Sequence, residues 1–447
     1  MLFVAIFALT SCTVGPNYQK PVVPVPDQFY GATATPDATS LADAKWFDVF
    51  GDPVLRSLIE EALRNGYDAR IAATRVEEAR ARYGIAGAAR FPEVDYQART
   101  GYGREGGETG GAITANVAAA WEIDLWGRVR RLNEAARAQY LASEEGQRAV
   151  RLSLISEVAS AYFDLRELDE ELDIARRTTS AFQSTYDLFG RRLEGGTASA
   201  LETNRAEALL ANAAAQIPLI ESDIVATEND LNVLLGRQPG PIARGASLAA
   251  QPVPPAVPAG LPSALLLRRP DVRAAEQALI AANANVGVAQ AAFYPTLSLT
   301  GLLGVQSSDL SELFGEGRAW NIQAGLLGPI FNAGRLRNQR RVAVAQFDRA
   351  VAEYEQSVTS ALADASTSLV ALDKLAIAEQ ARQRALHANQ ESVRLVNLRY
   401  DSGLSAYFEV LDAMQQLFTA ENALARTRRD RLIALVRFYR ALGGGWE

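Results

Sequence analysis

The longest stretch without a helix-breaking residue constrains this chain more than any other feature. Residues 335–402 contain neither glycine nor proline, and after Gly403 residues 404–442 again contain neither. Because these two residues break helices most strongly, the region predicts one very long helix, a turn and a shorter return helix. At about 1.5 Å per residue, the first helix would be roughly 100 Å long. Apolar residues recur every three or four positions, which is typical of a helix packed along its length against other helices.

A second copy of this pattern lies in the first half of the sequence. One constant shift along the chain brings Gly127 onto Gly334 and Gly196 onto Gly403. Each half has the same plan: a helix, two strand-like runs, a long helix, a turn and a return helix. Internal repeats of this size indicate a duplicated architecture. We therefore expect one elongated body, mainly α-helical with a small β part, rather than two or three unrelated domains.

The expected boundaries follow from the repeat and from composition. The segments are residues 1–11, a lipoprotein signal peptide; 12–52, an extended tether; 53–249, repeat 1; 250–262, a proline-rich linker; and 263–443, repeat 2. Within the repeats, β-hairpins are expected over 93–125 and 296–331, and helical tips near 193–199 and 398–405. Residues 53–89 are expected to form a single helix, because apolar side chains recur on one face of it.

Composition argues against several classes of function. The net charge of −7 argues against a nucleic-acid partner. Cys12 is the only cysteine and His387 the only histidine, so neither a disulfide framework nor a soft-metal site is expected. His387 lies in a long helical stretch without a nucleophile motif nearby, so we expect no enzyme activity and no cofactor. No unbroken apolar run reaches about eighteen residues, so no membrane-spanning helix is expected.

The N-terminus has the features of a lipoprotein precursor. Residues 2–9 form an apolar run like the core of a signal peptide, although no Lys or Arg precedes it. The run ends in LTSC, which resembles the motif cleaved before the cysteine of a bacterial lipoprotein. Cleavage would free Cys12 for acylation, and several acyl chains anchor a protein stably. Because Thr13 rather than Asp follows, as in known lipoproteins sorted to the outer membrane, we expect a lipid-anchored protein of the Gram-negative outer membrane.

Two regions change from helical to alternating periodicity. After Pro92, apolar residues such as Val94 and Tyr96 alternate with polar ones, and residues 296–331 repeat the pattern. Alternating runs of about nine to eleven residues are the length that transmembrane β-strands need. A soluble sheet with one solvated face would show the same alternation, so both interpretations stay open.

Four strands could not close a membrane barrel alone. Their edges would leave unpaired backbone groups in lipid, at a cost of several kcal/mol each. If these strands span a membrane, several chains must therefore share one barrel. Three chains would give a barrel of about twelve strands, which is wide enough for a pore.

Four short stretches carry a family resemblance. Residues 265–273 read LLLRRPDVR, residues 12–18 read CTVGPNY, and residues 399–403 and 410–413 read RYDSG and VLDA. Together with the duplication, they resemble the outer-membrane efflux channels, the TolC and OprM family, and particularly its lipoprotein branch. The resemblance covers essentially the whole mature chain.

This resemblance implies a homotrimer with a twelve-stranded barrel in the outer membrane and a tunnel of helices across the periplasm. The helix tips would meet a periplasmic adaptor protein, which connects the channel to an inner-membrane pump of the RND type. The residues expected at these tips are Gly196, Thr197, Ser199, Arg399, Tyr400, Gly403, Leu404 and Ser405. The two glycines suit a turn that needs a residue without Cβ, and a plain helix C-cap would use them equally.

The family also narrows its tunnel near the tips with apolar and acidic residues. The matching positions are Phe408 and Asp412, one helical turn apart. Three-fold symmetry would gather their side chains into a constriction that repels anions and blocks solutes until the helices splay. Alternatively, Phe408 belongs to the helix-packing core and Asp412 to a solvated or Arg-paired face. Arg205 occupies the position equivalent to Asp412 in repeat 1 and is a candidate partner in the closed state.

Two other functions remain as alternatives. One is a periplasmic structural coiled-coil protein, tethered by Cys12, whose strands form a soluble sheet. The other is the same kind of channel serving type I protein secretion instead of small-molecule efflux. The lipidation motif at Cys12 favours the drug-efflux branch, by resemblance to that branch alone.

Overall fold

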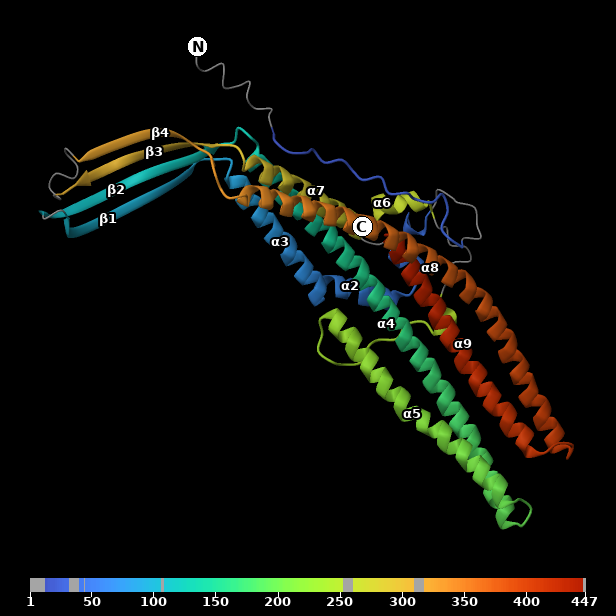
Figure 1. The fold of residues 1–447 in the computed structure, drawn as a ribbon. Coiled ribbons are helices and arrows are strands. Elements are labelled where there is room, and N and C mark those ends of the chain that lie inside the picture. Colours follow the sequence, from blue (N-terminus) through green and yellow to red (C-terminus); the bar gives the residue numbers. More distant parts are fainter. Residues whose placement is uncertain are drawn as a thin grey trace. The chain divides into compact units, whose positions relative to one another are not determined.

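Long helices and one small sheet form the described part of the chain (Figure 1). The computed structural model describes residues 13–31, 40–43, 45–105, 108–251, 260–308 and 317–444. Cys12, the predicted signal peptide and most of the predicted linker lie outside these residues. In chain order the main elements are α1 (Trp46–Phe50), α2 (Pro53–Asn65), α3 (Tyr67–Ala88), β1 (Glu93–Glu105), β2 (Glu108–Ile123), α4 (Arg128–Glu194), α5 (Ala200–Leu235), α6 (Leu265–Arg268), α7 (Pro270–Ala291), β3 (Thr296–Ser307), β4 (Arg318–Leu327), α8 (Arg335–Asp401) and α9 (Tyr407–Ala441). The expected class, mainly α-helical with a small β part, is confirmed.

The chain divides into two compact units, which are described separately. The first comprises Met1–Val23, Thr74–Gly146 and Arg273–Ser357 and contains the sheet. The second comprises Pro24–Ala73, Gln147–Val272 and Val358–Glu447 and contains both hairpin tips. One limit between the units falls between Val23 and Pro24, and the others fall inside α3, α4, α7 and α8.

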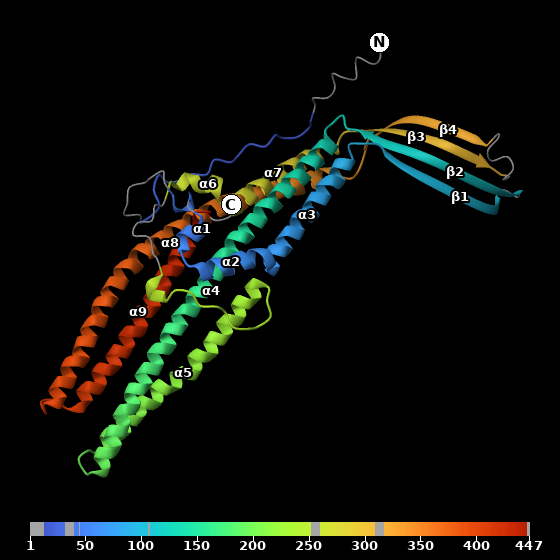
Figure 2. The ribbon, with the colours of Figure 1, turned by 180° about the vertical axis from the view of Figure 1, so that it is seen from behind.

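Two helical hairpins correspond to the two repeats. α4 and α8 have 67 residues each, and α5 and α9 return beside them with 36 and 35 (Figure 2). The turns depend on Gly196 and Gly403, both at φ +71°, where a side chain would be strained. After the first glycine, Thr197 N donates to Arg192 O at 2.8 Å, and Leu404 N makes the equivalent bond at the second turn at 2.8 Å. These bonds satisfy helix-end carbonyls, as in Schellman caps.

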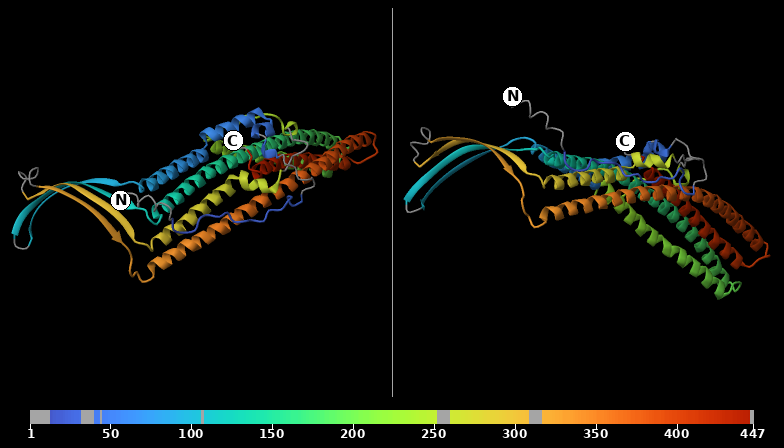
Figure 3. Two further views of the ribbon diagram at one scale, coloured as in Figure 1. Left: turned by 90° about the horizontal axis from the view of Figure 1, so that it is seen from above. Right: turned by 45° about the horizontal axis from the view of Figure 1, so that its top comes forward.

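The four strands form one antiparallel sheet in the order β1-β2-β3-β4 (Figure 3). The central β2–β3 pair joins repeat 1 to repeat 2. One row of side chains across the sheet consists of Tyr96, Val117, Leu303 and Trp320. All four are exposed, Tyr96 at 88 % and Trp320 at 75 %. This row of the sheet is therefore apolar, and none of the residues that the structure describes covers it.

The row of residues next to it is different in character. Gln97, Asn116, Gly304 and Ala319 lie opposite one another across the same four strands. Because successive side chains of a strand point to opposite faces, these small and polar residues belong to the other face of the sheet. An apolar face outward and a polar face inward is the arrangement of a transmembrane barrel wall.

The helix expected over residues 53–89 is interrupted, so that expectation was wrong in this respect. Gly66 separates α2 from α3 and has an extended ψ of 139°. A Cβ at Gly66 would lie 2.5 Å from the Ala62 carbonyl oxygen and 2.7 Å from that of Leu234. Close backbone approach between α2 and α5 therefore requires glycine here, which helical periodicity does not reveal.

Among the described residues, one helix is long and apolar enough to cross a membrane by length and composition. This helix is α5, whose most apolar stretch has a mean hydropathy of 1.2. The sequence expectation considered only unbroken apolar runs. It therefore missed α5, whose mean hydropathy is high because alanines and leucines are scattered among its polar residues. Only 6 % of that stretch is buried within the chain, and Leu219 and Val233 are 60 % and 66 % exposed. Surface of this kind usually faces lipid or another protein surface.

The core of the second unit lies where α1 and α2 pack on α4, α5 and α9. Its fully buried residues include Leu55, Tyr162, Leu235 and Phe438. At its edge the Asp52 carboxylate caps α2 by accepting from Val54 N at 2.8 Å.

Candidate functional site at the hairpin tips

Most of the residues predicted to face the adaptor lie at the surface of the two tips. Gly196, Thr197, Ser199, Arg399, Gly403 and Leu404 are exposed, and Tyr400 and Ser405 are half-buried. Ser199 begins α5 with a reciprocal capping box to Glu202, whereas Ala406 at the start of α9 has no side-chain cap. A capping box therefore stabilises the first helix after the tip of repeat 1, and the corresponding helix of repeat 2 lacks one.

A side-chain cluster near the tips joins the two hairpins. The Tyr407 hydroxyl on α9 lies 2.9 Å from Thr185 Oγ1 on α4, and the Tyr407 ring packs on those of Phe189 and Tyr400, at 4.6 and 4.7 Å between centroids. Arg192 donates to the Tyr400 hydroxyl and lies 5.5 Å from the centre of its ring. Phe189 and Thr185 are only 2 % and 5 % exposed. This tip cluster (Thr185, Phe189, Arg192, Tyr400 and Tyr407) holds the end of α4 against α8 and α9.

The predicted constriction residues lie beside this cluster on α9. Phe408 is 58 % exposed, and Asp412 is exposed one turn later and accepts a hydrogen bond from Gln416 Nε2 at 2.7 Å. The Arg205 guanidinium of α5 lies 5.3 Å from the centre of the Phe408 ring, a cation–π distance. Among the described residues, Arg205 and Asp412 form no ion pair. Within one chain, Arg205 therefore contacts the aromatic member of the predicted constriction.

Farther along the same helices, arginines of α9 pair with carboxylates of α4. Arg426 lies 2.7 Å from Glu171 and 3.7 Å from Glu167, and Arg429 lies 3.0 Å from Asp164. Burial, together with the neighbouring Glu171 carboxylate, raises the pKa of Glu167 to about 7. The contact between the hairpins thus contains a carboxyl group that titrates near neutral pH.

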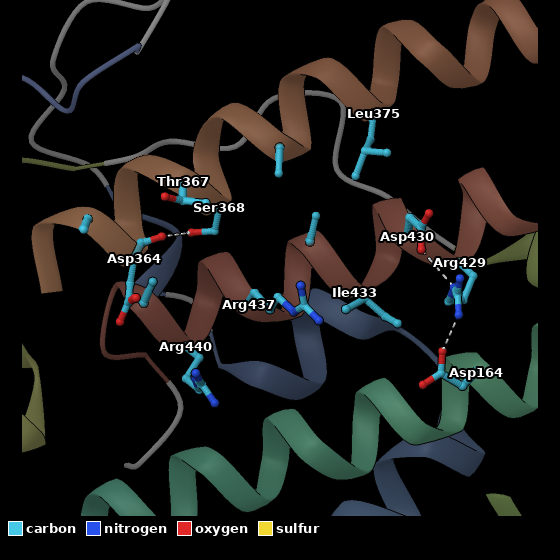
Figure 4. A pocket seen from close by; sticks show the side chains of 14 residues that line it. Asp164, Asp364, Thr367, Ser368, Leu375, Arg429, Asp430, Ile433, Arg437 and Arg440 are labelled. Atoms are coloured by element: carbon cyan, nitrogen blue, oxygen red, sulfur yellow. Dashed lines mark hydrogen bonds and ion pairs between the residues drawn. The ribbon is translucent and has the colours of Figure 1, made fainter. Parts of the chain in front are cut away.

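A cavity of about 670 Å³ opens between α8 and α9, with Asp164 of α4 near one end (Figure 4). The charged residues that line it are Asp164, Asp364, Asp430, Arg429, Arg437 and Arg440. Arg429 lies 3.0 Å from both Asp164 and Asp430, and Asp364 lies 3.2 Å from Arg269. Because acidic and basic groups balance, the cavity is not built to select an ion of one sign, and we do not include it in the constriction.

The structure adds residues that sequence reasoning missed. Thr185, Phe189 and Arg192 have the spacing i, i+4, i+7, which places them on one face of α4 and could have indicated a contact surface. Their partners on α8 and α9 depend on how the hairpins meet, which no local pattern specifies. Cys12, the predicted lipidation residue, lies outside the described residues. Within the described ranges, no group of three or more His, Cys, Asp or Glu side chains is arranged to hold a metal ion.

Comparison with known proteins agrees with this geometry. Residues 58–237 and 261–444 match the family described as outer membrane efflux protein. The chain is 37 % identical over 458 residues to the solvent efflux pump outer membrane protein SrpC of Pseudomonas putida, covering 99 % of this chain and 97 % of SrpC. It is 35 % identical over 450 residues to the probable outer membrane lipoprotein SilC of Salmonella typhimurium, covering 99 % and 97 %.

The fold also matches solved channels of this kind. The open state of the MtrE outer membrane channel of Neisseria gonorrhoeae aligns with a TM-score of 0.89 at 34 % identity, over 98 % of this chain and 99 % of MtrE. At such identity and coverage, shared ancestry accounts for the fold and for both repeats. The chain belongs to the outer membrane efflux protein family.

Proposed function

We propose that this outer-membrane channel of a tripartite efflux pump works as a homotrimer, with one shared barrel and a duct built from the helical hairpins. The chain passes solutes received in the periplasm to the outside of a Gram-negative cell. The duct itself performs no reaction, and the pump in the inner membrane supplies the energy.

The four-stranded sheet is the main observation that supports the proposed trimer. Its apolar row is exposed, and the outer edges of β1 and β4 have no strand partner within the described chain. In a bilayer, each unpaired backbone group on such an edge would cost several kcal/mol. Pairing β4 of one copy with β1 of the next removes both edges, and three copies give about twelve strands, enough for a pore. A neighbouring copy would also cover the exposed apolar stretch of α5.

We assign the closed gate to two groups of residues near the tips: a ring formed by Phe408 and Asp412, and the tip cluster. Phe408 and Asp412 of three copies form a ring that narrows the duct and places three carboxylates on its axis. The tip cluster keeps the two hairpins of each copy together, so the ring widens only when these contacts break. Arg205, whose guanidinium lies over the Phe408 side chain, keeps that side chain in place within each copy.

The exposed tips are the proposed docking surface for a periplasmic adaptor, which links the channel to an RND-type pump. Leu404 is 70 % exposed at the second tip, and an uncapped turn beside it can adjust to a partner. The relative SrpC is named for solvent efflux, so small organic molecules are the proposed cargo. Protein secretion and a purely structural role are not favoured by the family.

We further assign membrane attachment to acylation of Cys12. The lipobox-like sequence that ends in LTSC supports this assignment. The relative SilC is described as a lipoprotein. Attachment through several acyl chains would be stable. It would anchor the protein in the membrane in addition to the barrel.

Single-channel conductance in planar bilayers tests the gate. Wild-type protein is compared with Asp412→Ala and with Glu207→Ala, which removes an exposed carboxylate from α5 outside the proposed ring. We expect small, cation-favouring currents in the wild type and in Glu207→Ala, and several-fold larger currents with weaker cation preference in Asp412→Ala. Large, identical currents in all three proteins would still support a channel but would exclude Asp412 as its gate.

A trimer assay on the same samples separates assembly from gating. Native mass spectrometry of the detergent-extracted protein should show three copies. A stable monomer that remains in carbonate-washed membranes would contradict the shared barrel.

A further inference from the structure

The two repeats carry different charges where the strands lead into the long helices. In repeat 1, each arginine at the start of α4 is paired with a carboxylate: Arg128 with Glu122 at 2.5 Å, Arg130 with Asp124 at 3.3 Å and Arg131 with Glu134 at 2.8 Å. The positive charge at this end of repeat 1 is therefore neutralised within the chain.

Repeat 2 lacks these carboxylates. The shift that superposes the repeats replaces all three of them: Glu122 by Pro329, Asp124 by Phe331 and Glu134 by Arg341. Residues 319–347 contain four arginines and no acidic residue. These four are exposed and form what we call the basic patch: Arg335, Arg337, Arg340 and Arg341. None of them forms an ion pair with a residue that the structure describes.

Helix stability does not account for the basic patch. The helix macrodipole places partial positive charge at the N-terminal end, where further cations are unfavourable. The first turn of α8 contains no acidic residue. In α4, by contrast, the Asp124 carboxylate accepts from Val129 N and Arg130 N at 3.1 and 2.9 Å. Because the uncompensated charges of the patch repel one another, a partner of negative charge would stabilise this surface.

Carboxylates of a neighbouring copy do not suit this role. In the proposed trimer, β1 of the next copy pairs with β4, and its first acidic residues are Glu93 and Asp95. Val94, between them, shares the apolar face of the sheet with Tyr96 and is 63 % exposed. Successive side chains of a strand point to opposite faces, so both carboxylates belong to the polar face, inside the proposed barrel. Even if both were paired with arginines, two arginines of the patch would remain.

Exposed apolar side chains adjoin the basic patch. Phe331, shortly after β4, is 88 % exposed, and Ile330 beside it is fully exposed. Arg335 N donates to Asn332 O at 2.9 Å, so the chain turns from this apolar pair directly into α8. In the proposed barrel, this is the level at which the chain leaves the membrane. Apolar side chains next to several arginines are typical of surfaces that bind at the membrane–water interface.

The whole patch lies within electrostatic reach of that interface. Arg335 and Arg341 span about 9 Å along the helix axis, and the Debye length at physiological ionic strength is about 8 Å. Arg337 and Arg341 are at positions i and i+4, so they share one face of α8. A planar guanidinium can bind a phosphate through two parallel hydrogen bonds. The spacing and the chemistry therefore both fit phosphate groups at a membrane surface.

We propose that the basic patch, together with Ile330 and Phe331, binds anionic phospholipid head groups in the periplasmic leaflet of the outer membrane. The arginines contact the lipid phosphates, and the apolar pair lies among the first carbons of the acyl chains. Each copy presents one such surface. The inference rests on the proposed barrel, which sets the level of the membrane. It gives repeat 2 a lipid-binding role that the neutralised surface of repeat 1 does not share.

Native mass spectrometry of the full-length, detergent-extracted protein tests this. Phosphatidylglycerol is the anionic probe, and phosphatidylcholine is the zwitterionic one. Arg337→Gln/Arg341→Gln removes two charges from one face of the patch. Arg382→Gln/Arg384→Gln is the matched control, because these arginines are exposed farther along α8 and form no ion pair with a described residue. The same spectra report the number of copies in each protein.

We expect the wild type and the control to bind phosphatidylglycerol more tightly than phosphatidylcholine. Each arginine near an anionic lipid surface contributes about a fivefold increase in affinity. The patch variant should therefore bind phosphatidylglycerol about 25-fold more weakly than the wild type, while its affinity for phosphatidylcholine changes less than about twofold. If the double variant cannot be extracted, the two single variants decide, each with an expected loss of about fivefold.

Unchanged phosphatidylglycerol binding in the patch variant would overturn the lipid surface. If that variant also fell apart into monomers, the arginines would belong to a contact between copies instead. A trimeric wild type that binds both lipids equally would reject the lipid surface and leave the proposed channel intact. A monomeric wild type that prefers phosphatidylglycerol, with the preference lost in the patch variant, would support the lipid surface and reject the shared barrel.

Discussion

Replacing Tyr407 with Phe isolates one hydrogen bond of the tip cluster. The substitution keeps the ring that packs on Phe189 and Tyr400 and removes only the hydroxyl 2.9 Å from Thr185. Thr185 retains its bond to the Ala181 carbonyl at 3.1 Å, so no buried donor is orphaned. The loss is therefore the net value of one bond, about 1 kcal/mol. If three copies open together, about 3 kcal/mol shifts the equilibrium toward the open state by roughly 100-fold.

Open probability in planar bilayers measures this shift directly. Tyr83→Phe is the matched control, because the Tyr83 ring stacks on Tyr140 and its hydroxyl has no hydrogen-bond partner among the described residues. We expect Tyr407→Phe to open far more often than the wild type, with Tyr83→Phe unchanged. If Tyr407→Phe trimers gate like the wild type, the Thr185–Tyr407 bond does not hold the closed state. An intermediate rise of about fivefold would mean that the copies open independently.

Two further predictions concern stability. The pKa of Glu167 is raised to about 7 in the folded protein from an unfolded value near 4.5, so its contribution is fully present below about pH 4.5 and is lost as the pH rises through about 7. The thermal unfolding midpoint, followed by circular dichroism, should therefore fall between about pH 5 and pH 8, and less so in Glu167→Gln; equal slopes would contradict this origin. Asp52→Ala should lower the free energy of unfolding by roughly 2–4 kcal/mol, because the carboxylate caps α2 and accepts from Tyr162 and Gln251 at 2.9 and 2.7 Å. Asp52→Asn retains an acceptor and should cost less in denaturant titrations, and equal losses in both variants would exclude the hydrogen bonds as the cause.

Local patterns predicted the elements but not every break in them. The stretch without glycine or proline predicted a helix over 335–402, and the structure has α8 over Arg335–Asp401. Alternation predicted the strands, because a side-chain period of two is imposed by the strand itself. Periodicity predicted a continuous helix, but Gly66 interrupts it. The interruption arises because the α5 backbone approaches closely at this point. That approach is not encoded within the helix it breaks.

The sequence by itself determined the duplicated plan, the helix class, the alternating strands and the positions of both tips, because these depend on neighbours within a few residues or on the repeat. Only the tertiary structure decided that β2 pairs with β3, that the Arg205 guanidinium lies over the Phe408 ring, and that Tyr407 bonds to Thr185. Arg131 shows the difference most clearly. In sequence it is one arginine among many, and only folding brings the Gly15 carbonyl and the Asn17 side chain to its guanidinium. Contacts between segments far apart in sequence depend on how whole helices pack, and no local period encodes that.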